Sequence, residues 1–278
     1  MVRHSFSAMG TTVELFVEAE EASAELEAAE AEFERLEQVM SRFRPTSELS
    51  RLNGAGELDA SADLADVVKC ALDAKASTRG RFDATVHDAL VAAGYDRTFD
   101  HVPADAPAAC EPARCGGGVA VEGTRIMLDP GTRLDLGGIG KGYAAERVAT
   151  LLSLAGPCLV SAGGDIAVRS VPSTGTWPVA VSDELTLGLT RGGLATSGTE
   201  RRRWRRNGVE HHHLIDPATG RPAASDLLRV TAIGSDAVDA EVLATSIFIG
   251  GLEEALAADA PAVLLTVDGR TVITGGLA

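Results

Sequence analysis

Hydrophobic and polar residues alternate with two different periods along this chain. Residues 11–17, TTVELFV, alternate with period two, which predicts a strand with one buried face. Between residues 21 and 40 the apolar positions recur at helical spacing and acidic residues occupy the other side, which predicts an amphipathic helix. Its core-facing stripe comprises Leu26, Ala29, Phe33, Leu36 and Met40.

Similar patterns predict the remaining elements and the fold class. Residues 98–117, rich in Pro, Ala and Gly, are expected to form a surface loop excursion. Hairpins mixed with separate helices predict an α+β fold with largely antiparallel sheets and packed helices. Further helices are expected at about 64–74, 142–154 and 236–249. Strands are expected at 118–121, 125–128, 158–162, 177–182 and 227–233, and in the final pair AVLLTV and TVITGG, which closes on Asp268-Gly269.

Composition narrows the class of protein. The 278 residues are 45% hydrophobic, which suffices for a substantial core in one or two domains. The net charge of −15 argues against non-specific nucleic-acid binding, because phosphates would be repelled over most of the surface. Neither a membrane span nor a leader peptide is recognisable, so we expect a cytoplasmic protein. Its cysteines are then expected to be free thiols, although the spacing of Cys110 and Cys115 weakly suggests zinc.

Two glycine-rich segments suggest a ligand site. In LDLGGIGKGYAAE (134–146) a strand-like start passes through glycines into a helix, where backbone N–H groups and Lys141 could face an anion. The segment is neither a Walker A loop nor GxGxxG, and a purely structural glycine turn is the alternative. In SAGGDIAV (161–168) paired glycines permit close approach of a ligand, whereas Asp165 could simply cap a turn.

The segment from 194 to 208 contains a serine and a basic run. Ser197 in LATSGTE does not lie in a nucleophile elbow, because Ala195 and Thr199 stand where G-x-S-x-G requires glycine. The run ERRRWRRNG that follows is most simply a solvated hairpin turn, with contact to a phosphate as the alternative.

The sequence HHHLIDPATGRP at 211–222 places three histidines directly before a turn. A metal cluster, a catalytic histidine with incidental neighbours, and a polar strand end without function are all compatible with it. In an extended segment His211 and His213 share a face, which keeps a metal pair possible. An imidazole there could also orient or deprotonate a hydroxyl, because it titrates near neutral pH.

Taken together, the motifs resemble those of the ApbE-type flavin transferases, which move FMN from FAD onto a threonine or serine of a target flavoprotein. Each motif is weak alone, but their joint order along nearly the whole chain is specific. The resemblance implies a single domain over residues 1–278. The motifs are AMGT (8–11), SRFRPTSELSRLN (41–53), GRFDATV (80–86), LDLGGIGKGYAAERV (134–148), SAGGDI (161–166), ATSG (195–198), HLIDPATGRP (213–222) and AEVLATS (240–246).

The resemblance also implies the FAD-binding residues. Phe43 stands where the family commonly has Tyr, so the stacking face is kept and the hydroxyl is lost. Met9 and Phe82 could instead be core residues. The residues implied to bind FAD are Met9, Phe43, Arg81, Phe82, Asp83, Lys141, Glu146, Asp165, Ser197 and Ile215.

By the same correspondence, Mg²⁺ would be held by the main-chain carbonyl of Gly138, the carboxylate of Glu241 and the hydroxyl of Thr245. Positions 241 and 245 are i and i+4, which places both side chains on one helix face. His213 matches the family histidine, as base or as flavin-site residue. Glu241 and Glu146 replace the usual aspartates, and Glu241 could alternatively be a solvated helix residue.

The resemblance implies an Mg²⁺-dependent FAD:protein FMN transferase that releases AMP. Two other functions fit the same residues. An FAD pyrophosphatase would use water in place of the acceptor hydroxyl and release FMN and AMP. A non-catalytic flavin-binding protein would bind FAD without turnover, which the two glutamates at aspartate positions make conceivable.

Overall fold

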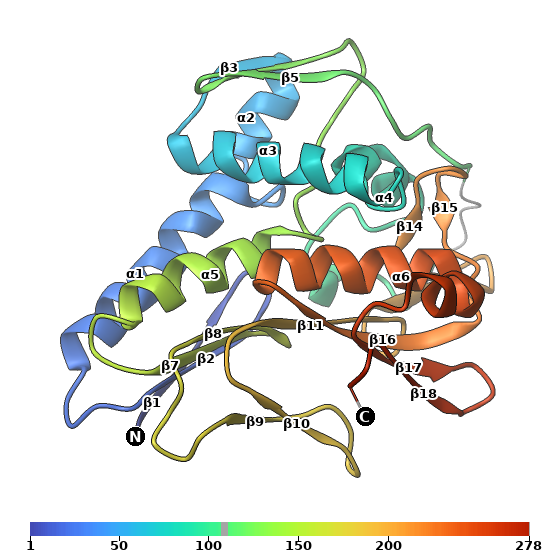
Figure 1. Cartoon of the computed structure of the whole chain (residues 1–278). Helices are drawn as coiled ribbons and strands as arrows, with labels where there is room; N and C mark the ends of the chain where they lie inside the picture. Colours follow the sequence, from blue (N-terminus) through green and yellow to red (C-terminus); the bar gives the residue numbers. More distant parts are fainter. Residues whose placement is uncertain (107–110, 278) are drawn as a thin grey trace.

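An eight-stranded sheet forms the centre of the computed structural model, which describes residues 1–106 and 111–277 (Figure 1). Its order is β1-β2-β7-β8-β11-β16-β17-β18, and each neighbouring pair is antiparallel. The predicted class, α+β with largely antiparallel sheets, is therefore confirmed. The strands are β1 (Val2–Ala8), β2 (Thr11–Val17), β7 (Cys158–Ala162), β8 (Asp165–Arg169), β11 (Gly192–Gly198), β16 (Leu227–Gly234), β17 (Ala262–Thr266) and β18 (Thr271–Thr274).

Smaller sheets surround this centre. The pair β4–β12 is parallel, whereas the other small ladders are antiparallel. The ladders are β10-β9, β13-β12-β4, β14-β15 and β3-β6-β5. Their strands are β3 (Glu57–Asp59), β4 (Asp105–Ala106), β5 (Val119–Glu122), β6 (Arg125–Leu128), β9 (Trp177–Ala180), β10 (Thr186–Leu189), β12 (Arg203–Arg206), β13 (Val209–His212), β14 (Ile215–Asp216) and β15 (Arg221–Pro222).

Helices cover one face of the large sheet, and the β9–β10 hairpin covers the other (Figure 1). Helices α5 and α6 lie directly on the sheet, α5 against β7 and β8 and α6 against β11 and β16. None of the described helices is both long and apolar enough to cross a bilayer. The helices are α1 (Ser23–Met40), α2 (Glu48–Ala55), α3 (Ala62–Ser77), α4 (His87–Ala92), α5 (Gly140–Leu152) and α6 (Ala237–Ala258), with short 3₁₀ turns at Ala84–Val86 and Phe99–His101.

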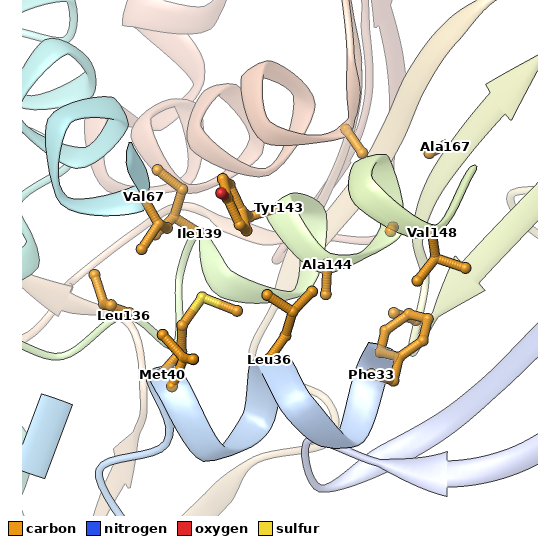
Figure 2. Close-up of a cluster of buried hydrophobic side chains, with 14 of the residues drawn as sticks. Phe33, Leu36, Met40, Val67, Leu136, Ile139, Tyr143, Ala144, Val148 and Ala167 are labelled. Carbon is orange, nitrogen blue, oxygen red and sulfur yellow. The ribbon is translucent and has the colours of Figure 1, made fainter. Parts of the chain in front are cut away.

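The main core lies between α1, α5 and the sheet. Figure 2 shows Phe33, Leu36 and Met40 of α1 directed at α5, where Ala144 and Val148 face them, while Tyr143 lies beside Val67 of α3. The whole stripe predicted from helical spacing is buried, as are Val13, Leu15 and Val17, the alternate residues of β2. The helical period and the strand alternation therefore both identified the apolar faces that are buried, and this burial stabilises the fold.

Three local predictions differ from the structure. Helix α6 was expected to end near 249, but it turns at Gly251, whose φ of 77° is left-handed, and resumes to Ala258. The run at 200–208 is not simply a solvated turn, because Trp204 in β12 is buried and donates its indole N–H to the Ala93 carbonyl at 2.8 Å. Within the expected excursion at 98–117, Phe99 packs on Tyr95 and Trp204, and residues 105–106 form β4.

Candidate active site

The predicted site residues, with one exception, line a single cavity of about 400 Å³. The fold gathers them from segments that are far apart in the sequence, since β1–β2, α5, β8, β11 and α6 all contribute. Glu146 is the exception. The predicted residues in the cavity wall are Met9, Phe43, Arg81, Phe82, Asp83, Gly138, Lys141, Asp165, Ser197, His213, Ile215, Glu241 and Thr245.

A lysine between two buried carboxylates forms one wall. The ammonium group of Lys141 pairs with Asp165 and lies 2.7 Å from Oε1 of Glu241. Burial disfavours the charged form of Lys141, but the two carboxylates outweigh burial and raise its pKa. Burial likewise raises the pKa of Glu241, against the opposing effect of Lys141. Asp165 is thus an ion-pair partner in the cavity wall, and Glu241, only 3% exposed, is not a solvated helix residue.

Glu241 reaches this position because α5 and α6 approach closely at Gly142. A Cβ atom on Gly142 would lie 2.6 Å from the Ala237 carbonyl oxygen, so a larger residue would separate the helices. The Gly142 N–H donates to Oε2 of Glu241 at 2.8 Å. One glycine of the sequence motif therefore serves helix packing and carboxylate placement.

Two hydroxyl groups lie beside the carboxylates. Thr245 follows Glu241 by one helical turn, and both side chains are buried on the same face of α6, as the spacing predicted. Its Oγ1 lies 3.0 Å from Oγ of Ser197 in β11, and the two hydroxyls share a hydrogen bond. The site thus combines two carboxylates with two hydroxyls.

The three consecutive histidines are directed to different surroundings. His211 stacks on Trp204, and His212 faces the Ala223 carbonyl, with its Nε2 at 3.1 Å. His213 lines the cavity, and its Nδ1 is buried without a hydrogen-bond partner among the described residues. Burial, followed by the positive charge of Arg202, lowers the pKa of His213 to about 3. At neutral pH His213 is therefore uncharged, and its buried Nδ1, like that of His211, has no hydrogen-bond partner among the described residues.

This buried histidine predicts a loss of stability in acid. The folded-state pKa of about 3 lies below the ordinary 6.5, so the unfolded chain binds the proton more readily. The folded state keeps its full stability with respect to His213 above pH 6.5, and the free energy of unfolding decreases as the pH falls from 6.5 toward 3. In denaturant titrations at pH 7 and 4.5, the free energy of unfolding of the wild type should fall more than that of His213→Ala, by up to about 1 kcal/mol per pH unit. Equal decreases would contradict this.

Around Phe43, which the resemblance had implied, lies an aromatic and cationic wall whose other members the sequence interpretation did not include. The guanidinium of Arg42 lies 4.1 Å from the ring centre of Phe43 and 4.7 Å from that of Tyr95, and it pairs with buried Asp135. Phe99 completes the wall. Arg42 and Asp135 lie inside the ApbE-type motifs at 41–53 and 134–148, so membership of a motif could have indicated that they line the site. Tyr95 and Phe99 carried none beyond being aromatic in a chain with 4% aromatic residues.

The remaining predicted residues are held by local contacts. Arg81 pairs with Glu254 at 2.8 Å, and Asp83 pairs with Lys75 at 2.8 Å. Met9 has a left-handed φ of 51°, and its N–H donates to Glu37 at 2.8 Å. Phe82 is buried and belongs to the main core as well as the cavity wall.

The turn after His213 is formed as predicted. The Gly220 N–H donates to the Asp216 carbonyl at 2.9 Å, and the Ala218 N–H donates to the Asp216 side chain at 2.9 Å. This turn joins β14 to β15 and fixes Ile215 in the cavity wall.

The ApbE family model matches residues 9–262 of the sequence. This chain belongs to the ApbE family.

Relatives within the ApbE family cover most of the chain. The FAD:protein FMN transferase of Salmonella typhimurium is 30% identical over an alignment of 241 residues that covers 78% of this chain and 68% of the relative. That of Vibrio cholerae is 30% identical over an alignment of 271 residues that covers 90% of this chain and 81% of the relative. The structure titled flavin transferase ApbE from Vibrio cholerae superposes with a TM-score of 0.77 at 25% identity, covering 99% of this chain and 97% of the other. An ApbE protein of Thermotoga maritima has a TM-score of 0.86 at 24% identity, covering 98% and 96%, and supports the fold.

Glu146, although part of an ApbE-type motif, does not line the cavity. Its Oε1 accepts the N–H of Ala237 at 2.6 Å, at the first turn of α6, and its Oε2 pairs with Arg169. The glutamate therefore joins α5, β8 and the helix that carries Glu241. The longer side chain provides the reach that this three-way contact requires.

Loss of this contact should affect stability more than ligand affinity. We expect Glu146→Ala to lower the free energy of unfolding by about 1–3 kcal/mol, because a helix N–H and Arg169 lose their partner. Glu253→Ala, on an exposed side of α6, is the matched control and should change little. Unchanged stability with weakened FAD binding in Glu146→Ala would instead indicate a direct role at the cofactor.

The described cysteines 70, 115 and 158 are free, in agreement with the expectation, and Cys110 lies outside the described residues. In the described part of this ApbE-family chain, no three His, Cys, Asp or Glu side chains are placed to hold one metal ion. The predicted Mg²⁺ donors are of another kind, since they combine one carboxylate, one hydroxyl and one main-chain carbonyl. Such an all-oxygen set fits Mg²⁺, which retains several waters.

Proposed function

We propose that this protein is an FAD:protein FMN transferase, which transfers FMN from FAD to a threonine or serine of a target flavoprotein and releases AMP. The observation that supports it most is the cavity. It brings buried carboxylates, paired hydroxyls and the unpartnered Nδ1 of His213 together with an aromatic wall. Relatives named FAD:protein FMN transferase match most of the chain.

The chemical parts of FAD correspond to different parts of the cavity. The aromatic wall of Phe43, Tyr95 and Phe99 provides apolar surface for a ring system such as the flavin. The glycines before α5 place main-chain groups at a helix N-terminus, where an anion is favoured. We therefore assign the flavin to the aromatic side and the pyrophosphate to the side of Lys141 and His213.

The proposed reaction is a phosphoryl-type transfer. The acceptor oxygen forms a bond to the FMN phosphorus while the bond from that phosphorus to the bridging oxygen breaks, so AMP leaves with the electron pair. The acceptor proton passes to the imidazole of His213, which is neutral and lines the cavity. A bound pyrophosphate would raise the pKa of this imidazole, because negative charge nearby favours the imidazolium.

Glu241, Thr245 and the carbonyl of Gly138 would hold the divalent ion in this proposal. When bound, Mg²⁺ would neutralise charge on the pyrophosphate. Lys141 now balances the carboxylates of Glu241 and Asp165, so these groups are already arranged around a positive charge. Thr245, one helical turn after Glu241, is oriented by its hydrogen bond with Ser197.

Mass spectrometry of three reaction mixtures tests the proposal. Purified protein is incubated with FAD, Mg²⁺ and a candidate acceptor flavoprotein, with matched mixtures that lack either the acceptor or Mg²⁺. The expected result is a covalent FMN adduct on a Thr or Ser and free AMP, only in the complete mixture. Free FMN and AMP without an adduct would indicate a pyrophosphatase. Intact FAD, bound to the protein, would indicate a non-catalytic flavin-binding protein.

A further inference from the structure

The cations that line the cavity are nearly all balanced by carboxylates. Arg42 pairs with Asp135, Arg81 with Glu254, and Lys141 with two acidic groups at once. Arg44 pairs with two glutamates of α1. Arg202 differs, since in the described part of the chain neither an ion pair nor a side-chain hydrogen bond engages its guanidinium.

The chain directs Arg202 inward. Residues 201, 203 and 205 are exposed, whereas Arg202 is half-buried and lines the cavity, and Trp204, two residues on, is buried in the aromatic cluster. This alternation is that of an extended segment leading into β12. The charge of Arg202 acts on His213, since after burial it is the next cause of the lowered pKa of that imidazole.

A guanidinium at the wall of a cavity without a counter-ion favours an anionic ligand. Lys141 is poorly suited to supply this attraction, because Asp165 and Glu241 together outweigh its single positive charge. Arginine presents a planar fork of N–H donors that matches two phosphate oxygens, and it remains charged at all working pH values.

We propose that Arg202 binds a phosphate group of the dinucleotide substrate directly, beside His213. This inference rests on the proposed function for the identity of the ligand. It assigns to Arg202 the recognition of the anion that sequence reading had placed at Lys141, and it leaves Lys141 to organise the two carboxylates. It also gives a role to one residue of the basic run at 200–208, whose exposed arginines lie outside the cavity wall.

The Kd values of FAD and riboflavin distinguish recognition of the phosphates from recognition of the ring system, because riboflavin has the same ring system but no phosphate. Arg202→Met removes the charge and keeps much of the length of the side chain. We expect it to raise the Kd of FAD about 10–100-fold, the range for losing charged hydrogen bonds, and to leave that of riboflavin within about 2-fold. Arg203→Met, the exposed neighbour, is the matched control and should change neither value. Flavin fluorescence titration measures both.

A second readout is the dependence of FAD affinity on salt. The Kd of the wild type should rise with NaCl, that of Arg202→Met should rise less steeply, and Arg202→Lys should retain part of the dependence. An FAD Kd in Arg202→Met equal to that of the wild type would overturn the inference, as would equal weakening of FAD and riboflavin. If Arg202→Met does not fold, Arg202→Lys and Arg202→Gln carry the same comparison.

These measurements need no turnover, so the two proposals can fail separately. A wild type that binds FAD through Arg202 but forms no adduct contradicts the proposed transferase and keeps this inference. A wild type that forms adducts while Arg202→Met binds FAD normally contradicts this inference alone. Absence of FAD binding by the wild type contradicts both.

Discussion

Replacing His213 with alanine is expected to slow FMN transfer by about 10²–10⁴-fold, the usual range for a general base, while the Kd of FAD changes little. The imidazole is neutral, lies in the cavity wall and has an Nδ1 with no partner among the described residues. Its loss would remove the proposed proton acceptor without removing the aromatic wall to which we assign the flavin. Single-turnover measurements with saturating FAD and acceptor separate the rate of transfer from the affinity.

The neighbouring histidines provide matched controls for this prediction. His211 stacks on Trp204 and His212 faces a main-chain carbonyl, so neither has access to the cavity that His213 lines. His211→Ala and His212→Ala should therefore transfer FMN within about 10-fold of the wild-type rate, well short of the general-base range. Equal large losses in all three variants would support a metal cluster and contradict the role assigned to His213. A lower FAD affinity with an unchanged rate in His213→Ala would make it a flavin-site residue.

Replacing Glu241 with alanine is expected to abolish Mg²⁺-dependent turnover. No neutral residue replaces the charge that a carboxylate provides to a divalent ion. Thr245→Ala should weaken turnover, because it removes a neutral ligand, and Glu241→Asp should retain measurable activity, because a small shift of helix or ion restores the contact. Transfer rates measured over a series of Mg²⁺ concentrations distinguish these outcomes.

A separate control is needed because Glu241 also stabilises the fold. Its carboxylate accepts the Gly142 N–H and pairs with Lys141, so its loss leaves a buried ammonium with one partner. Glu241→Gln keeps the size of the side chain and the acceptor for Gly142, but it turns an NH₂ group toward the Lys141 ammonium. It should therefore be inactive and less stable than the wild type, so the unfolding midpoint of each Glu241 variant is measured and activity is compared at temperatures where the variant is folded. An alanine variant with unchanged activity and unchanged Mg²⁺ dependence would remove the metal assignment.

Much of the fold could be predicted from local pattern. The helical stripe around Phe33 and the alternation of Val13, Leu15 and Val17 identified buried faces correctly, because each side chain's direction follows from the period of its own element. The i, i+4 spacing of Glu241 and Thr245 placed them together for the same reason. The motif order along the chain predicted the family that the comparisons confirm.

Local pattern could not reveal the surroundings of residues whose contacts come from distant segments. Glu146 lies in an ApbE-type motif, but the position of α6 and Arg169 decides that it braces a helix terminus. Trp204 lies in a basic run, but Tyr95 and Ala93, more than a hundred residues earlier, provide its buried contacts. The contacts of Glu146 and Trp204 produce no periodic pattern in the sequence, so local pattern cannot predict them.

The sequence by itself determined many of the longer elements, the fold class and the family, since these depend on side-chain periodicity and on which residues occur in order. Only the tertiary structure decided which charges are balanced. Lys141 appears in sequence as a free cation before a helix, and Arg202 as one of five arginines in a solvated run. Folding places two carboxylates on Lys141 and turns Arg202 into the cavity. The physical reason is that ion pairing acts over a few ångströms in space, whereas the chain separates Lys141 from Glu241 by 100 positions.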